Sequence, residues 1–153
     1  MKINRELLDD VSLKAKQSER LRMNYNFHES YDSGAQRMLN ALEIGTNLPI
    51  HRHKHTNETY IVLRGAIEVR FYDYPKNDNS DNSNSDNSNS TVGSYNLEVV
   101  DSFVLDPLLE EYGVDIPKGV WHDLIVLKHD TVIFEVKDGP YDVTLTEQYI
   151  SES

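Results

Sequence analysis

The sequence contains no cysteine. This absence excludes disulfide bonds, cysteine-ligated zinc and thiol nucleophiles. Any metal ion must therefore be held by imidazole, carboxylate or other oxygen donors. A glycine-rich phosphate loop and a G-x-S-x-G elbow are absent as well, which sets aside P-loop nucleotide hydrolysis and serine hydrolase chemistry.

Long apolar runs are also missing. Charged residues interrupt the opening MKINRELLDDV, and nowhere do about 18 apolar residues follow one another, as a membrane-spanning helix would require. We therefore expect a soluble, cytoplasmic protein with no membrane partner.

Basic residues are few: 15 Lys and Arg stand against 26 Asp and Glu, which gives a formal net charge of −11. This charge repels phosphate backbones and argues against nucleic acid as a partner. A local basic patch around Arg20, Arg22 and Arg37 could still receive a small anionic substrate. A chain of 153 residues predicts one domain, residues 1–153.

The periodicity of apolar residues changes along the chain. Leu7, Leu8, Val11 and Ala15 recur at helical steps after Asn4, a plausible N-cap. We expect residues 1–35 to form a short helix and an arm. Alternating residues and turn signals then predict strands within residues 36–150, namely 37–44, 59–63, 67–72, 97–105, 112–116, 122–127 and 132–137. Many short strands of this kind are typical of a β sandwich or barrel.

Residues 77–90, NDNSDNSNSDNSNS, have no apolar side chain. Such a segment cannot offset the entropy of ordering its backbone, so we interpret it as a mobile loop between two strands. Asp81 and Asp86 could supply oxygens to calcium, but the spacing of an EF-hand is missing.

The segment from Gly45 to Gly65 predicts a metal site. Residues two apart in a strand point to one side, so His51 and His53 can present both imidazoles to one point. Glu58 follows closely, and His122 comes after a turn elsewhere in the chain. Three imidazoles and one carboxylate suit one divalent transition metal, such as Zn, Fe, Mn or Ni, better than Mg or Ca.

These spacings resemble the motifs of the cupin superfamily. Gly45, five residues, His51-x-His53, four residues, Glu58, six residues and Gly65 match its first motif position for position. Pro117, Gly119 and His122 match the second, although Glu111 replaces its leading glycine and Val126 its closing Asn. The resemblance implies a mostly β fold, a double-stranded β-helix or jelly-roll barrel with a short N-terminal helix, and the four metal ligands above.

The chain is also similar to the WbuC family of cupin-fold metalloproteins, which are encoded among bacterial O-antigen and surface-polysaccharide genes. The likeness covers nearly the whole chain outside the Asn/Ser loop. It is carried by the segments RMNYNFH (22–28), QRMLNALE (36–43), PIHRH (49–53), ETYIVLRG (58–65) and FEVKDGPY (134–141). This resemblance implies a small sugar-like substrate and leaves the reaction open. Cupins commonly pair through strand edges, so a homodimer is possible.

Further polar residues are candidates for contact with substrate. His55 shares the strand parity of His51 and His53, which makes it a rival ligand or a residue at the rim of the site. His28 could reach over the barrel mouth as a catalytic base or could simply be a surface histidine. Asn40 and Glu135 interrupt apolar strands, so we expect them to face either the interior or solvent. We take Glu135 as a second candidate base and Asn40, His55 and Tyr60 as candidate substrate contacts, although a tyrosine such as Tyr60 often belongs to the core.

Two classes of function remain open. The first is a metal-dependent enzyme acting on a sugar or sugar-nucleotide intermediate of bacterial surface polysaccharide, by isomerisation or epimerisation. An iron-dependent dioxygenase belongs to the same class. The second is a non-catalytic module that binds a sugar through its metal.

Overall fold

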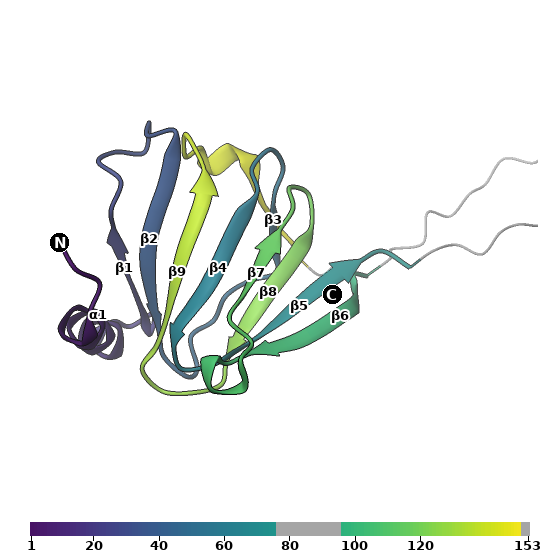
Figure 1. Ribbon diagram of the computed structural model, residues 1–153. Helices are drawn as coiled ribbons and strands as arrows, with labels where there is room; N and C mark the ends of the chain where they lie inside the picture. Colours follow the sequence, from purple (N-terminus) through teal and green to yellow (C-terminus); the bar gives the residue numbers. More distant parts are fainter. Residues whose placement is uncertain (76–95, 151–153) are drawn as a thin grey trace, which may run out of the picture.

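The computed structural model describes residues 1–75 and 96–150 (Figure 1). The predicted loop 77–90 lies outside the described residues. The elements are α1 (Arg5–Gln17), β1 (Arg22–Asn26), β2 (Ala35–Leu42), β3 (His51–His53), β4 (Glu58–Arg64), β5 (Ile67–Asp73), β6 (Glu98–Leu105), η1 (Pro107–Leu109), β7 (Gly113–Ile116), β8 (Trp121–Val126), β9 (Thr131–Asp138), η2 (Val143–Leu145) and β10 (Thr146–Gln148).

The strands form two antiparallel sheets of five strands each. One sheet has the order β1-β2-β9-β4-β7 and the other β10-β3-β8-β5-β6 (Figure 1). Neighbours in each sheet are mostly distant in sequence, because successive strands cross from one sheet to the other. This architecture confirms the predicted mostly β fold with one short N-terminal helix.

An apolar core lies between the two sheets. Inward-facing side chains alternate with outward-facing ones along each strand. On β5, for example, Ile67 and Val69 both point inward and are fully buried. The buried members are Leu42, Tyr60, Val62, Ile67, Val69, Leu105, Ile116, Leu124, Val126 and Ile133.

The helix α1 covers the outer face of the first sheet. Its N-cap is Asn4, whose Oδ1 accepts a hydrogen bond from the backbone N–H of Leu7 at 3.1 Å. The apolar face of the helix packs on β2 and β9 through Val11, Ala15, Leu39, Ala41 and Val132. Arg64 fastens the helix to β4, because its Nη2 donates to the backbone O of Leu8 at 3.0 Å and to Ser12 Oγ at 2.9 Å.

Two strands have no counterpart among the predicted ones. The segment expected to be an arm contributes β1, which pairs with β2 so that Asn24 lies opposite Asn40. The short β10 pairs with β3, and Thr146 lies opposite His53. Both strands are short and stand at sheet edges. In β1 the apolar Met23 and Tyr25 alternate with polar residues, whereas β10 is polar throughout. Both strands nevertheless contribute side chains to the interior.

The turn between β4 and β5 depends on a glycine. Gly65 has φ +83°, in the left-handed region, and a Cβ at this position would lie 2.7 Å from Thr131 Cα. The close approach of β9 therefore requires a residue without a side chain.

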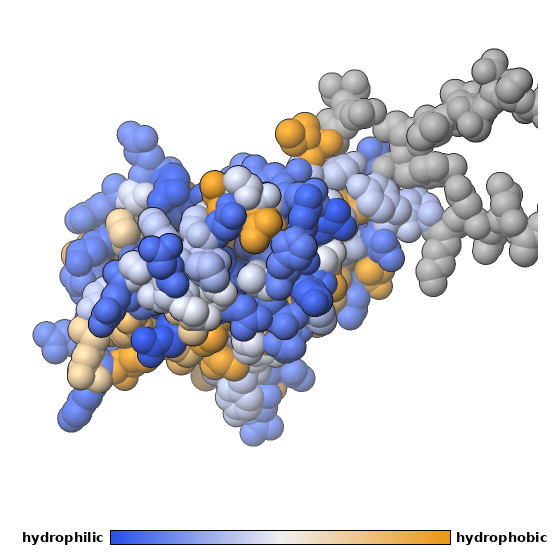
Figure 2. All heavy atoms as spheres, turned by 90° about the horizontal axis from the view of Figure 1, so that it is seen from above, coloured by the Kyte–Doolittle hydropathy of each residue, from blue (hydrophilic) through white to orange (hydrophobic). Residues whose placement is uncertain are grey.

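The face shown in Figure 2 is largely hydrophilic, with hydrophobic side chains in small separate groups. Among the described residues, no helix has the length and apolarity needed to cross a membrane.

Candidate metal centre

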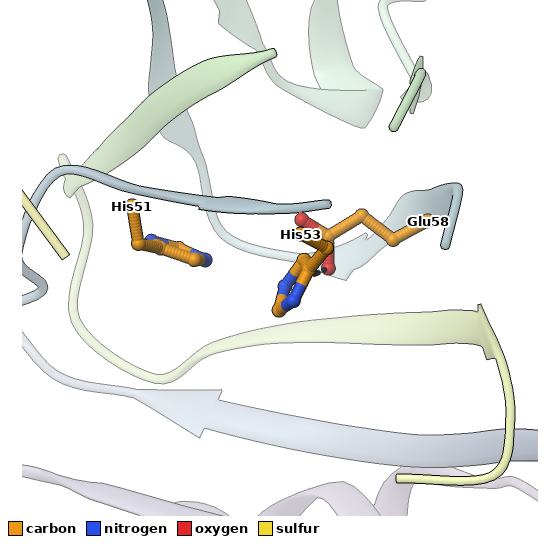
Figure 3. A group of neighbouring side chains, drawn as sticks. All are labelled: His51, His53 and Glu58. Carbon is orange, nitrogen blue, oxygen red and sulfur yellow. Dashed lines mark ion pairs between the residues drawn. The ribbon is translucent and has the colours of Figure 1, made fainter. Parts of the chain in front are cut away.

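Two histidines project from the short strand β3. Because His51 and His53 are two residues apart, their side chains point to the same side of the strand, and their ring centroids are 5.2 Å apart (Figure 3). Cross-strand pairing places His51 opposite His122 of β8. The second sheet thus brings three imidazoles together from two strands.

Glu58 reaches these histidines from the opposite sheet. It begins β4, its side chain is 2% exposed, and its Oε2 lies 3.4 Å from His53 Nε2 (Figure 3). His51, His53 and Glu58 each offer one donor atom, and these three atoms lie within 4.8 Å of one another. The three residues therefore form a group that could hold a metal ion.

His122 lies beside this group. Its side chain is 1% exposed, its ring centroid is 4.4 Å from that of His51, and its Nε2 lies 2.6 Å from Glu58 Oε1. The compact group of three does not include His122. The fourth predicted ligand thus contacts the carboxylate of Glu58 directly, whereas its distances to the two β3 histidines are larger.

Backbone carbonyls orient two of the rings. His51 Nδ1 lies 3.0 Å from the carbonyl O of Pro49, and His122 Nδ1 lies 2.9 Å from that of Val120. A carbonyl oxygen only accepts, so Nδ1 carries the hydrogen in both rings and Nε2 is left with a lone pair. Such a bond on the far nitrogen is what orients histidine ligands in metal proteins.

The buried polar atoms at this point lack partners. Both carboxylate oxygens of Glu58 and Nε2 of His122 are buried without a hydrogen bond among the described residues. The 2.6 Å contact between Glu58 Oε1 and His122 Nε2 does not have hydrogen-bond geometry. Two lone pairs this close repel each other unless they share a cation, either a proton or a metal ion. The donor set, imidazole nitrogen and carboxylate oxygen, fits a divalent transition metal.

The electrostatics favour the ligand forms of two of these groups. Burial, together with the neighbouring His122, lowers the pKa of His51 to about 4. Burial opposes ionisation of Glu58, but the imidazoles of His122 and His53 hold its pKa well below the usual range. Burial also opposes protonation of His122, yet the Glu58 carboxylate raises its pKa. At neutral pH His51 is therefore neutral and Glu58 is ionised, as metal ligands must be.

A second polar group lies on the first sheet. Glu135 of β9 is 9% exposed and accepts a hydrogen bond from Nδ2 of Asn40 on β2. Burial and the charge of Glu58 raise the pKa of Glu135 to about 7. Tyr60 lies opposite Glu135 in the sheet, and burial, Glu58 and Glu135 raise its pKa well above the usual value. This group thus combines a carboxyl group that titrates near neutrality with a phenol that stays protonated.

Both groups line one cavity of about 310 Å³ inside the barrel. A volume of this size is at the lower end of the range for small-molecule sites. Its walls are formed by Arg22, Asn24, Asn40, Leu42, Leu48, Pro49, His51, His53, Glu58, Tyr60, His122, Asp123, Leu124, Ile133, Glu135, Lys137, Tyr141, Thr146 and Gln148.

One protein family matches this sequence. Its description is a domain of unknown function, DUF6016, and the match covers residues 3–81, just over half of the chain. This chain belongs to the DUF6016 family. No curated protein matches the sequence of this DUF6016 protein at a significant level.

Solved structures establish the fold of the DUF6016 chain. The capsular polysaccharide assembling protein CapF from Staphylococcus aureus has a TM-score of 0.56 and 21% identity, covering 86% of this chain and 32% of CapF. The Cnp3 cupin domain from Schizosaccharomyces pombe gives 0.52 and 10%, covering 78% of this chain and 66% of that one. KdgF from Halomonas sp. gives 0.51 and 12%, covering 80% and 82%. The DUF6016 protein thus has the predicted cupin jelly-roll fold, and it spans about a third of the length of CapF.

Two of the predicted site residues of the DUF6016 chain lie away from the cavity. His28 is half-buried, and its Nδ1 accepts a hydrogen bond from the backbone N–H of Arg37 at 3.1 Å. His55 follows the end of β3 and is exposed. Neither residue lines the cavity, whereas Asn40, Tyr60 and Glu135 do.

Lys137 is the residue of this cavity that the sequence analysis missed most clearly. It is 8% exposed and lies two positions after Glu135 on β9. A lysine is usually taken for a surface residue. The strand parity that Lys137 shares with Glu135 was the available signal.

Proposed function

We propose that this protein is a metal-dependent cupin enzyme that binds one divalent transition metal through His51, His53, Glu58 and His122. The observation that carries the proposal is the cluster of buried donor atoms without hydrogen-bond partners, from the Glu58 carboxylate and His122 Nε2. Their desolvation is costly without a cation, and the hydrogen on Nδ1 of His51 and His122 leaves Nε2 free for one.

The chemistry of the cavity suits a proton transfer next to a polarised substrate. A bound metal would act as a Lewis acid toward a carbonyl or hydroxyl oxygen. Glu135, with its pKa of about 7, is poised to accept and return a proton at neutral pH, and Asn40 holds its carboxyl group in place. The protonated Tyr60 can donate a hydrogen bond to a developing negative charge.

The proposed substrate is a sugar or sugar-nucleotide intermediate of bacterial surface polysaccharide, and the proposed reaction is an isomerisation or epimerisation. Two likenesses support this choice: the sequence segments that resemble those of the WbuC family and the fold similar to that of a capsular polysaccharide assembling protein. We assign the role of base to Glu135 rather than His28, because Glu135 lines the cavity with the candidate metal ligands.

The first test is elemental analysis of protein purified without a metal-affinity tag. We expect close to one transition-metal ion per chain in the wild type and a large loss in Glu58→Gln, since an amide is a poorer ligand than a carboxylate. His55→Ala is the matched control, because it removes an exposed imidazole close to the site in sequence. A wild type that takes up no transition metal, even when metal is supplied, would refute the proposed centre.

The second test separates an enzyme from a binding module. Metal-loaded protein is incubated in D2O with candidate keto sugars and sugar nucleotides, and NMR follows exchange of the carbon-bound hydrogens. We expect exchange with the wild type and its loss in Glu135→Gln at unchanged metal content. Binding of a sugar without exchange or turnover would favour the non-catalytic module, and consumption of dioxygen with the iron form would favour the dioxygenase.

A further inference from the structure

Lys137 is one of the charged side chains of the cavity, with Arg22 and Asp123, that have no role in the chemistry above. Ile133, Glu135 and Lys137 alternate along β9 and all face the cavity. Lys137 lies opposite Glu58 in the sheet, next to the candidate metal centre. With 8% exposure, it is the most deeply buried lysine among the described residues.

Lys137 forms no ion pair with a described carboxylate, although its charge partly offsets the raised pKa of Glu135. The described lysines 14, 16, 54 and 128 each lie within 2.8 Å of a carboxylate oxygen. Among the described residues, no carboxylate oxygen lies within ion-pair distance of Lys137 Nζ, whose recorded neighbour is the ring of Tyr141, with its centroid 5.3 Å away. The stem of Lys137 is buried, whereas its Nζ is not among the fully buried side-chain atoms that lack a partner, so the ammonium is accessible from the cavity. The face of an aromatic ring satisfies such a charge only in part.

A second polar atom in the cavity also lacks a partner. Oδ1 of Asn40 is buried and accepts no hydrogen bond from the described part of the chain, whereas Nδ2 of the same amide donates to Glu135. When Glu135 is ionised its carboxylate needs a donor, so the amide presents Nδ2 to it and leaves Oδ1 to accept. The natural partner of such an oxygen is a hydroxyl or N–H group of a ligand.

We propose that Lys137 binds the anionic group of the substrate, a carboxylate or a phosphate, while a hydroxyl of the same molecule donates to Asn40. The substrate class is then an anionic monosaccharide, a sugar acid or a sugar phosphate. This inference rests on the proposed function for the reaction that such a substrate undergoes.

The dimensions agree with one sugar ring. Asn40 lies opposite Ile133 of β9, and Lys137 follows Ile133 by four residues on the same strand. The backbone positions of Asn40 and Lys137 are therefore about 13 Å apart along the strand direction. A hexose with one charged substituent and a hydrogen bond at each end covers a span of this order. The cavity of about 310 Å³ accommodates one such ring and leaves little room for a nucleotide.

The test is calorimetric titration of metal-loaded protein at constant ionic strength with three probes: D-glucuronate, D-glucose 1-phosphate and neutral D-glucose. The variant is Lys137→Met, which keeps the length of the side chain and removes its charge. We expect it to weaken at least one of the two anionic probes by about 10- to 100-fold and to leave glucose within about twofold, the size of a lost charged hydrogen bond. The anionic probe whose affinity falls in Lys137→Met shows whether the site prefers a carboxylate or a phosphate.

Lys118→Met is the matched control, because Lys118 is exposed, lies outside the cavity and carries the same charge. It should bind all three probes as the wild type does. Lys137→Arg, which keeps the charge, should retain a preference for the anionic probe and serves as the second variant if Lys137→Met does not fold.

Three results would overturn the proposal: no binding of either anion to the wild type at millimolar concentration, equal weakening of glucose and the anions in Lys137→Met, or the same loss in Lys118→Met. Metal content, measured on the same samples, separates this failure from failure of the proposed function. If the protein has full metal occupancy but shows no Lys137-dependent preference for anions, the proposed role of Lys137 is wrong and the proposed metal centre stands. If anion binding depends on Lys137 but the chain takes up no metal, the proposed metal-dependent function is wrong and the role of Lys137 stands.

Discussion

Replacing Glu135 by Gln should make the stability of the metal-free protein respond to pH in a new way. Glu135 has a pKa of about 7 in the folded chain, against 4.5 for an ordinary glutamate, because it is buried and faces the charge of Glu58. Between these values the folded state holds a proton that the unfolded state has released. Stability conferred by the protonated carboxyl group is thus fully present below about pH 4.5 and is lost as the pH rises toward 7.

The magnitude follows from the size of the shift. A rise from 4.5 to about 7 corresponds to about 3 kcal/mol of unfolding free energy. Glutamine cannot titrate, and it is similar enough in shape to remain near Asn40. The free energy of unfolding of Glu135→Gln, relative to the wild type, should therefore rise by about 3 kcal/mol between pH 4 and pH 8. Contributions of other groups, such as the half-buried His51, largely cancel in this difference.

Urea denaturation with a chelator present measures this difference. Fluorescence of Trp121, the single tryptophan of the chain and 8% exposed, reports unfolding. Glu19→Gln removes an exposed carboxylate and controls for the change in net charge. A difference between Glu135→Gln and wild type that is constant from pH 4 to pH 8, or that falls with pH, would show that Glu135 does not titrate as the geometry requires.

Three further predictions concern the site and its scaffold. His122→Ala should lower metal affinity by more than the 10- to 100-fold that is typical for residues that only hydrogen-bond to a metal ligand, whereas His55→Ala should leave the affinity near that of the wild type. Competition with a chelator measures both affinities. A larger loss in His55→Ala than in His122→Ala would show that the assigned ligands are wrong. Gly65→Ala should cost more than about 1 kcal/mol of unfolding free energy, because φ is +83° and the new Cβ would meet Thr131; an unchanged urea midpoint would contradict this. Arg64→Met should cost about 1–3 kcal/mol and increase hydrogen exchange in α1, because three hydrogen bonds to the helix are lost, one of them the ion pair with Asp9; unchanged exchange would mean that apolar packing alone holds it.

The sequence predicted those parts of the fold whose periodicity arises from local packing. The alternation along β5 and β9 and the helical spacing before Gln17 each reflect one face turned to the core, so the elements appear where expected. The strands β1 and β10 were missed because β10 is short and polar, and because the alternation of Met23 and Tyr25 in β1 spans too few residues to distinguish a strand from an extended arm. Their hydrogen bonds come from β2 and β3, which no local pattern reveals.

The candidate site divides in the same way. Spacing along one strand and one turn was enough to select His51, His53 and Glu58, which the structure brings together. His28 was selected for its place in a similar segment, but its ring is bound to the backbone of Arg37, a contact that depends on the path of the chain after β1. Lys137 was overlooked because a lysine is usually a surface residue, although it shares the strand parity of Glu135.

The donor atoms of the candidate metal centre are divided between the two walls of the barrel. His51, His53 and His122 belong to one sheet and Glu58 to the other, so an ion held by all four would act as a cross-link between sheets that are otherwise joined by loops and apolar packing. The distance between the sheets, set by core side chains such as Ile67 and Ile133, then fixes the distance between nitrogen and oxygen ligands. A cavity made by shortening either side chain would let the walls shift by fractions of an ångström. Metal affinity and choice of metal would thereby come under the control of residues that never contact the ion.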